Sequence, residues 1–422
     1  MKKIIIVLIV FSLIFISFFV FKKEEEKSNK NISVILETEE GNIESNTFPS
    51  NEDYEYLSTE CENTSDLVNV NFDENAWKLN LNVERESIDG KFNCTVHFKE
   101  KIKFAQDIII DKYSVDNNEG LIKINQPATV QTPELVEYRY SGSNEEVKNY
   151  VSFNGETWRI IGVFEVEGEN GNFEKRLKIM RNESIGAYSW DASAEDVNEG
   201  QGANQWGASG SYTNGADLMR VLNPGYESKK YGNSLYYNRG KGSCYYTHVS
   251  YDTHISPCDF TKTGLKTETK DFIDKVKWHT AAVNYEKLTS ELYKEERGNL
   301  VGLSEEDGIT RTTSWIGLVG LVNISDYGYS SKDCYEFYSP HEYNTLESCT
   351  SSSWMLAHEF EWTITPAAGY ATRVIYISEN GSIGRNLGYY HDIIRPVVFL
   401  KTNVKIISGS GLESDPYILE LN

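Results

Sequence analysis

A single apolar run at the start of the chain constrains where the rest of the protein can fold. After Met-Lys-Lys, residues 4–21 (IIIVLIVFSLIFISFFVF) carry no charge. A helix rises about 1.5 Å per residue, so this run nearly crosses a hydrocarbon core of about 30 Å. The remaining sequence is acidic and holds no second run of this kind. The simplest topology is therefore one membrane span with the C-terminal part exported.

Two interpretations of the run compete, a cleaved signal peptide and an uncleaved signal anchor. Cleavage requires small residues at the end of the apolar core, which is usually about 7–15 residues long. Here the core is longer and ends with the bulky residues Phe18, Phe19, Val20 and Phe21. We therefore favour the anchor. It predicts a single-pass protein of the cell membrane, held through residues 4–21, whose C-terminal part is extracellular.

The cysteines of an exported chain are expected to form disulfides, and this chain has an even number of them. The six residues are Cys61, Cys94, Cys244, Cys258, Cys334 and Cys349. Six cysteines allow fifteen pairings, and proximity in the sequence favours Cys61–Cys94, Cys244–Cys258 and Cys334–Cys349. The alternative is a metal site or a catalytic thiol. The sequence has neither a CxxC motif nor His residues at ligand spacing, so we predict no metal and no cofactor.

The overall charge argues against one class of partner. The chain has 63 acidic and 41 basic residues, which gives a net charge of −22. Nucleic-acid binding depends on clustered lysine and arginine, so we expect no nucleic-acid partner. A large net charge instead suits a soluble surface protein, because it limits self-association.

Composition and periodicity divide the chain into four parts. A charged stalk (KKEEEKSNKN) follows the apolar run, and then apolar residues alternate with polar ones, as in WKLNLNV (77–83) and FNCTVHF (92–98). This period of two predicts short strands. We expect a membrane anchor with a short stalk at 1–31, a small β-sandwich at 32–99, a linker with strand character at 100–136 and a larger domain at 137–422.

The larger domain mixes both types of secondary structure. Asn154-Gly155 separates two apolar, β-rich runs and predicts a hairpin. Apolar spacing predicts a short helix at 215–225 and amphipathic helices at 269–278 and 285–298. Strand patterns return in RVIYISENGSIG (373–384). Strands, then helices, then strands again predict an α+β fold.

No catalytic motif is complete. His358-Glu359 resembles the start of a zinc-protease motif, but the position of the second histidine is occupied by Trp362. Glu359 with Glu361, or His391 with Asp392, could be named as a hydrolase pair. Among 63 acidic residues, a solvated face explains such pairs better. We therefore predict that the protein is not an enzyme and has no catalytic residue.

Aromatic residues are abundant, with 27 Tyr, 18 Phe and 8 Trp. Exposed Tyr and Trp on ordered loops make contact surfaces that lose little entropy on binding. The alternative is that these rings cover the edges of a β-rich domain. Several of them lie in polar, Gly-rich segments, and the candidates for a binding surface are Trp206, Tyr212, Tyr245, Tyr246, Tyr338, Tyr389 and Tyr390.

Two of the expected disulfides would close loops that are rich in aromatic residues. Cys244–Cys258 would enclose Tyr245 and Tyr246, and Cys334–Cys349 would enclose Tyr338. A loop that is ordered before binding suits a recognition surface. A purely stabilising role is the alternative for each disulfide.

Two resemblances follow from the residues. The segments NYVSFNGETWRIIGVF (149–164), LKIMRNESIGAYSWD (177–191) and IRPVVFLK (394–401) resemble a family of uncharacterised surface domains of low-GC Gram-positive bacteria. Residues 32–99 are similar to small Ig-like β repeats that end in a Cys-Thr-x-x-Phe motif, here Cys94 to Phe98. These resemblances imply an extracellular surface protein and bring no known activity.

A more distant resemblance is to C-type-lectin-like and formylglycine-generating-enzyme-like folds. It depends on the string Trp315-Ile316-Gly317-Leu318 and on the hairpin NGSIG followed by IRPVVFL. It implies a compact α+β domain with long loops. The Glu-Pro-Asn, Gln-Pro-Asp and Trp-Asn-Asp motifs of calcium-dependent sugar binding are absent from the sequence.

The function that these observations favour is ligand recognition or adhesion at the cell surface, with a glycan or protein ligand. A structural envelope protein is the second hypothesis. An enzyme acting on cell wall or glycan is the third hypothesis. Such an enzyme needs two carboxylates at a fixed separation in space, and the sequence does not show that separation.

Overall fold

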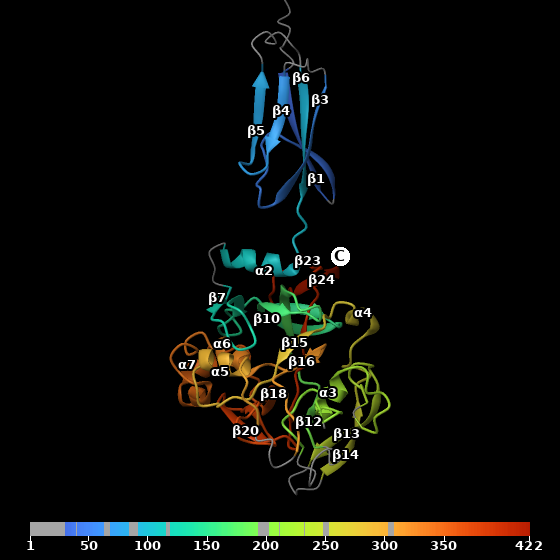
Figure 1. The fold of residues 1–422 in the computed structure, drawn as a ribbon, viewed down its shortest axis with the longest axis vertical. Helices are drawn as coiled ribbons and strands as arrows, with labels where there is room; N and C mark the ends of the chain where they lie inside the picture. The colour runs from blue at the N-terminus through green and yellow to red at the C-terminus, as the bar shows by residue number, and fades with distance from the viewer. Residues whose placement is uncertain are drawn as a thin grey trace, which may run out of the picture. The chain divides into compact units, whose positions relative to one another are not determined.

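The computed structural model describes residues 30–38, 40–62, 68–83, 92–114, 119–192, 202–210, 212–231, 233–247, 253–302 and 308–422. The chain forms two compact units, Met1–Ile102 and Lys103–Asn422 (Figure 1). The predicted boundaries of the β module and the linker were residues 99 and 136. Residues 103–136 belong to the larger unit, where Ala105, Ile109 and Leu121 lie in its core.

The smaller unit is a β structure with an aromatic core. Its sheet has the order β2-β1-β6-β3, with β1 and β6 parallel, and a separate hairpin joins β4 and β5. Val34, Phe72, Val96 and Phe98 are buried in the core, and the ring of Trp77 packs against Phe72. The strands are β1 (Lys30–Thr38), β2 (Gly41–Ser45), β3 (Tyr54–Glu62), β4 (Val68–Asp73), β5 (Lys78–Val83) and β6 (Phe92–Glu100).

The larger unit contains a nine-stranded sheet. Its main path is β17-β22-β11-β10-β9-β24-β23, and β8 pairs with both β10 and β7. The strands are β7 (Leu121–Gln126), β8 (Leu135–Tyr140), β9 (Tyr150–Phe153), β10 (Glu156–Glu167), β11 (Phe173–Arg181), β17 (Val319–Gly320), β22 (Val397–Phe399), β23 (Val404–Ser408) and β24 (Tyr417–Leu421). The predicted hairpin turn at Asn154-Gly155 joins β9 and β10, and both turn residues have positive φ angles, 59° and 75°. Asn-Gly favours this turn because both residues tolerate that conformation.

A second sheet of five strands has the order β12-β21-β18-β19-β20. Its strands are β12 (Ala187–Ser189), β18 (Glu361–Pro366), β19 (Arg373–Ile377), β20 (Ile383–Leu387) and β21 (His391–Ile393). Two hairpins complete the β structure of this unit, β13 (Lys241–Thr247) with β14 (Thr253–Asp259), and β15 (Val276–His279) with β16 (Ser314–Gly317).

The described helices are short, and one core joins them to the sheets. Trp158, Trp190, Trp206, Trp278 and Trp362 are all buried in this core. The helices are α2 (Ala105–Ser114), α3 (Asp217–Leu222), α4 (Thr267–Lys270), α5 (Thr289–Glu296), α6 (Ile324–Ser330), the 3₁₀ helix η3 (Pro340–Thr345) and α7 (Glu347–Ser351).

The predicted α+β, C-type-lectin-like class with a membrane anchor is wrong for the part of the chain that the structure describes. Strands account for 41% and helices for 13% of the structure, so the fold is β-rich. The helix expected at 269–278 shows why the prediction failed. Its apolar residues fit two periods, and Val276 and Trp278 are buried as alternate residues of β15. Pairing with β16 decides between the two periods.

The expected membrane anchor, residues 4–21, lies outside the described residues. Within the residues that are described, no helix has the length and apolar character that crossing a membrane requires.

Candidate functional site

The structure has the three disulfides that proximity in the sequence favours, Cys61–Cys94, Cys244–Cys258 and Cys334–Cys349. Cys61 and Cys94 are directly paired residues of β3 and β6. The second disulfide links β13 to β14, and the third encloses η3. Disulfides persist in oxidising compartments, which is consistent with an extracellular protein.

Four of the seven predicted binding aromatics are buried and do not form an exposed contact surface. Trp206 and Tyr212 are fully buried, and Tyr245 and Tyr389 are 9% and 5% exposed. The Tyr212 hydroxyl donates to the carboxylate of Asp191 inside the core. Polar, Gly-rich sequence around these rings indicated loops. It could not show that tertiary packing buries these rings.

The other three predicted aromatics differ from one another. Tyr338 is 40% exposed, and Tyr390 is partly buried and stacks on Tyr389 with ring centres 4.7 Å apart. The side chain of Tyr246 lies outside the described part of the structure. Phe337, which was not among the seven, is 72% exposed beside Tyr338 in the Cys334–Cys349 loop.

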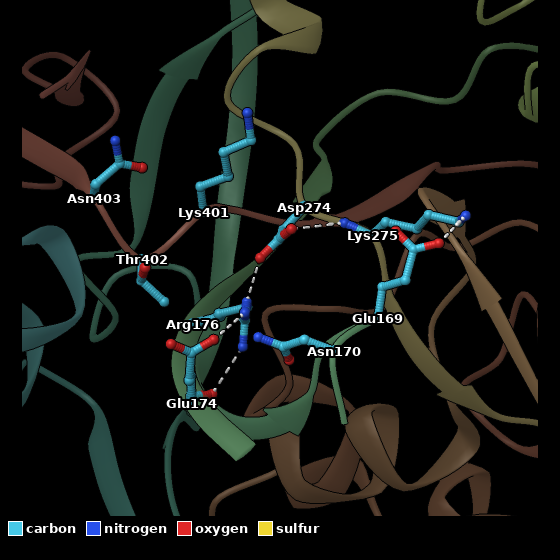
Figure 2. Close-up of a pocket in the computed structure, with 10 residues that line it drawn as sticks. Glu169, Asn170, Glu174, Arg176, Asp274, Lys275, Lys401, Thr402 and Asn403 are labelled. Carbon is cyan, nitrogen blue, oxygen red and sulfur yellow. Dashed lines mark hydrogen bonds and ion pairs between the residues drawn. The ribbon is translucent and has the colours of Figure 1, made fainter. Parts of the chain in front are cut away.

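A surface pocket of about 450 Å³ lies where the β10–β11 turn meets the segment before β15 and the link from β22 to β23 (Figure 2). All but one of its charged side chains pair with one another. Arg176 binds Asp274 and Glu174, each at 2.6 Å, and Lys275 binds Glu169 at 2.5 Å. The Lys401 amine has no hydrogen bond or ion pair to a described residue. Lys401 is therefore the one basic side chain of this pocket that could bind an anionic ligand without breaking an ion pair to a described residue. We do not consider this a strong binding site.

The two members of the suggested Glu359–Glu361 pair lie in different environments. Glu359 is exposed, whereas Glu361 is buried in an ion pair with Arg395 at 2.6 Å. Burial raises the pKa of Asp392 to about 7, and its Oδ2 atom has no hydrogen-bond partner among the described residues. The described residues also contain no group of three or more His, Cys, Asp and Glu placed to hold a metal ion.

A third region combines exposed cations with aromatic rings. The Arg–Tyr surface consists of Tyr285, His341, Tyr370, Arg373 and Arg385, each of them partly exposed. The guanidinium carbon of Arg385 lies 4.2 Å from the ring centre of Tyr370 and 5.0 Å from that of Tyr285. The guanidinium carbon of Arg373 lies 4.9 Å from the same Tyr370 ring. One tyrosine therefore holds two cations beside it.

Strand register places the two arginines together. Arg373 opens β19, and Arg385 is on β20, where it pairs with Ile375. Side chains two residues apart on a strand share a face, and directly paired residues point the same way. Arg373, Ile375 and Arg385 therefore lie on one face of the sheet.

The loop that carries Tyr370 is fixed by a buried side chain. Asn204 is 1% exposed, and its amide donates to the carbonyl oxygens of Tyr370 at 2.6 Å and Arg373 at 3.1 Å. Arg311 donates to the Asn204 side chain and to the Ala371 carbonyl oxygen, both at 2.6 Å. These hydrogen bonds hold the backbone of the loop in place without a ligand.

Two more segments complete the surface. The backbone amide of Ala368 donates to the Val283 carbonyl oxygen at 2.9 Å, which brings the chain leading to Tyr285 beside the loop. The His341 ring lies edge-on to Tyr285, with ring centres 5.0 Å apart. Its Nδ1 is 3.0 Å from the Ile383 carbonyl oxygen. That oxygen can only accept, so Nδ1 carries the proton.

The electrostatics of the Arg–Tyr surface are unusual for this chain. Neither the Arg373 nor the Arg385 guanidinium has a hydrogen bond or an ion pair to any described residue. Elsewhere, Arg139, Arg220 and Arg395 all bind carboxylates. Arg159 also lacks a carboxylate, but it is buried and donates to Asn149 and Asn144. In a chain with 63 acidic and 41 basic residues, two adjacent, partly exposed arginines without an acid among the described residues stand out. Their N–H groups remain available for an anionic partner.

Sequence reasoning missed this surface, although one signal for it was present. The strand patterns in RVIYISENGSIG flank the turn residues Glu379-Asn380-Gly381, and the structure shows a hairpin of β19 and β20 that carries Arg373 and Arg385. Working out the register of that hairpin would have brought the arginines together. Nothing local, however, places Tyr285 or Tyr370 beside them.

Comparisons with models of protein families, with curated proteins and with solved structures found no match. The resemblance to bacterial surface domains stays a prediction, and what the Arg–Tyr surface can bind has to be argued from its own chemistry.

Proposed function

We propose that this protein is an extracellular recognition protein that binds its ligand at the Arg–Tyr surface. The observation that carries this proposal is the pair of guanidiniums, Arg373 and Arg385, held beside Tyr370 without an acidic partner. Arginine and tyrosine are among the residues that contribute most to binding energy at protein interfaces. Arginine also offers a planar array of five N–H donors.

The surface is built before a ligand arrives. Asn204 fixes the Tyr370 loop, and the stacked rings restrict Arg385. Ordering a flexible side chain on binding costs roughly 0.5–1.5 kcal/mol, so groups that are already held in place keep more of their interaction energy. This arrangement supports binding better than a free surface arginine would.

The disulfide loop that carries His341 also exposes apolar area. Cys334–Cys349 encloses η3, which supplies His341, and the same loop exposes Phe337 and Tyr338. Exposed aromatic rings on an ordered loop are suited to contact a sugar or a protein. Recognition is therefore favoured over the structural hypothesis, for which these two rings would serve self-association.

The test is a binding screen with the oxidised full-length protein in mild detergent, against arrays of glycans and matrix proteins. The same screen is run with a variant that carries Arg373→Ala and Arg385→Ala. We expect specific binding by the native protein and its loss in the variant, with unchanged disulfides and melting temperature in both. An empty array, or equal binding by both proteins, would contradict the proposal.

A self-association measurement by analytical ultracentrifugation decides between recognition and the structural alternative. The recognition hypothesis expects the same association state for the native protein and for a Phe337→Ser variant. A native oligomer that dissociates in that variant would support a structural role.

A further inference from the structure

The chemistry of the Arg–Tyr surface indicates the class of ligand. We infer that it binds an acidic saccharide, with the carboxylate or sulfate of the sugar held by Arg385 and Arg373. This inference rests on the proposed recognition function and specifies its ligand. It begins from the two guanidiniums that lack an acid among the described residues.

The first step is the match between cation and anion. A guanidinium and a carboxylate form two parallel hydrogen bonds, and these charge-assisted bonds are about twice as strong as neutral ones. The guanidinium carbon of Arg385 lies over the rings of Tyr370 and Tyr285, 4.2 and 5.0 Å from their centres. Stacking involves the faces of the guanidinium, whereas hydrogen bonds leave from its edges. The edges of both arginines are therefore where an oxyanion would bind.

The second step concerns how much charge the ligand can carry. The protein has a net charge of −22, so a densely charged polyanion meets long-range repulsion. Salt screens that repulsion beyond about 10 Å, whereas direct contacts to two arginines act at shorter range. A ligand with one or two anionic groups among uncharged hydroxyls fits this balance. Sugar acids and sulfated sugars have that composition.

The third step disfavours an extended peptide. β20 is the edge strand of its sheet, and an exposed edge would accept a peptide as an added strand. Here η3 contacts β20, and His341 already uses the Ile383 carbonyl oxygen. A peptide would have to displace η3 to pair with this edge. A saccharide needs only the arginine edges and the tyrosine hydroxyl groups around them.

The experiment is isothermal titration calorimetry with oxidised full-length protein at low salt. The probes are a glucuronate-containing disaccharide, a disaccharide that carries one sulfate, and the neutral disaccharide of the same linkage. We expect binding of one or both acidic sugars and at least roughly tenfold weaker binding of the neutral one, because charge-assisted hydrogen bonds are lost. Which acidic sugar binds more tightly distinguishes carboxylate from sulfate as the preferred group.

Variants locate the site. Arg385→Ala is expected to weaken binding of the acidic sugar by roughly tenfold or more, and Arg385→Lys by less, because lysine keeps the charge but not the planar donors. Arg373→Ala is the second variant, in case Arg385→Ala disturbs the sheet. Lys175→Ala is the control, because it removes one exposed positive charge on β11, outside the surface. We expect less than a twofold change for that control.

Three outcomes would overturn the inference. The first is equal binding of acidic and neutral sugars. The second is binding that neither Arg373→Ala nor Arg385→Ala changes. The third is tighter binding of an acidic peptide with the same dependence on the arginines. A neutral ligand from the array screen that depends on these arginines would leave the recognition function standing and remove only the acidic-saccharide assignment.

Discussion

The larger unit treats its cations in two ways, and the comparison shows what each arrangement is for. In the core, Arg139 binds Glu137 and Asp326, each at 2.8 Å, and Lys178 binds Asp326 at 2.5 Å. All four charged groups are at most 2% exposed. At the Arg–Tyr surface, two partly exposed arginines have rings beside them and no carboxylate among the described residues. This core network pairs its four charges with one another, whereas the surface leaves two without an acid among the described residues.

Burial explains the pairing in this core network. A charge removed from water without a partner costs several kcal/mol. Desolvation lowers the pKa of Arg139, but the carboxylates of Glu137 and Asp326 raise it more, so the net direction is upward. Desolvation raises the pKa of Asp326, but Lys178 and Arg139 outweigh it, so the net direction is downward. Arg139 and Asp326 therefore favour each other's ionised form. The pKa of Lys178 moves downward, because its desolvation outweighs the attraction of Asp326.

The largest effect is expected from breaking the core network. Asp326→Asn leaves Lys178 and part of Arg139 without their carboxylate, and we expect the free energy of unfolding to fall by about 3–5 kcal/mol. Denaturant titration measures this change. Asp333→Asn makes the same chemical change at an exposed position, where we expect a change within about 0.5 kcal/mol.

A double variant sharpens this test. Adding Lys178→Met to Asp326→Asn removes the stranded ammonium, so the double variant is expected to recover part of the lost stability. If Asp326→Asn were no more destabilising than Asp333→Asn, the core ion pairs would not be what balances the buried charges.

Asp392 is buried like the charges of the core network, but its Oδ2 lacks a partner among the described residues. Burial raises its pKa to about 7, above the ordinary value near 3.9. The folded state therefore favours the protonated acid. This contribution to stability is fully present below about pH 4 and is lost as the pH rises through about 7.

Asp392→Asn tests this assignment. At pH 8 the native carboxylate is charged, and removing that charge is expected to stabilise the fold by up to about 4 kcal/mol, less whatever the buried amide costs. At pH 4 the gain is expected to disappear. Denaturant titration at both pH values measures the difference, and equal effects at the two values would show that Asp392 does not titrate between them.

A smaller effect is expected at Asn204, which connects the core to the Arg–Tyr surface. Asn204→Ala removes the donor for the Tyr370 and Arg373 carbonyl oxygens, and an unsatisfied buried polar group costs about 1–3 kcal/mol. Because Asn204 is 1% exposed, it does not offer itself to a ligand. We still expect weaker ligand binding, since the Tyr370 loop is no longer fixed. Unchanged affinity would mean that the loop is held by its other contacts alone.

The sequence predicted those features that depend on neighbouring residues. Alternating apolar and polar residues predicted the strands around Trp77 and Cys94, and Asn154-Gly155 predicted a hairpin. Closely spaced cysteines gave the disulfide pairs. Such features follow from local backbone preferences and short loop closures.

Features that depend on distant contacts could not be predicted in this way. Tyr212 is buried and its hydroxyl donates to Asp191, a contact that a pattern of residues does not show. The Arg–Tyr surface joins Tyr285, His341 and Tyr370 from three separate segments. Only packing of the two sheets and η3 brings them together, so the site emerges at the level of tertiary structure.

The smallest effect on stability is expected at the Arg–Tyr surface. This prediction distinguishes most directly between the paired charges of the core network and the two surface arginines. Arg385→Ala removes stacking on two partly exposed rings and breaks no ion pair to a described residue. We expect the free energy of unfolding to change by less than about 1 kcal/mol, while affinity for the acidic sugar falls. Measuring denaturation and binding on the same sample gives both values.

A loss of stability comparable to that of Asp326→Asn would make Arg385 a structural cation like Arg139, and the Arg–Tyr surface would then not have Arg385 available for a ligand. A small loss of stability together with lost binding would show that Arg385 serves the ligand and not the fold, in contrast to Arg139.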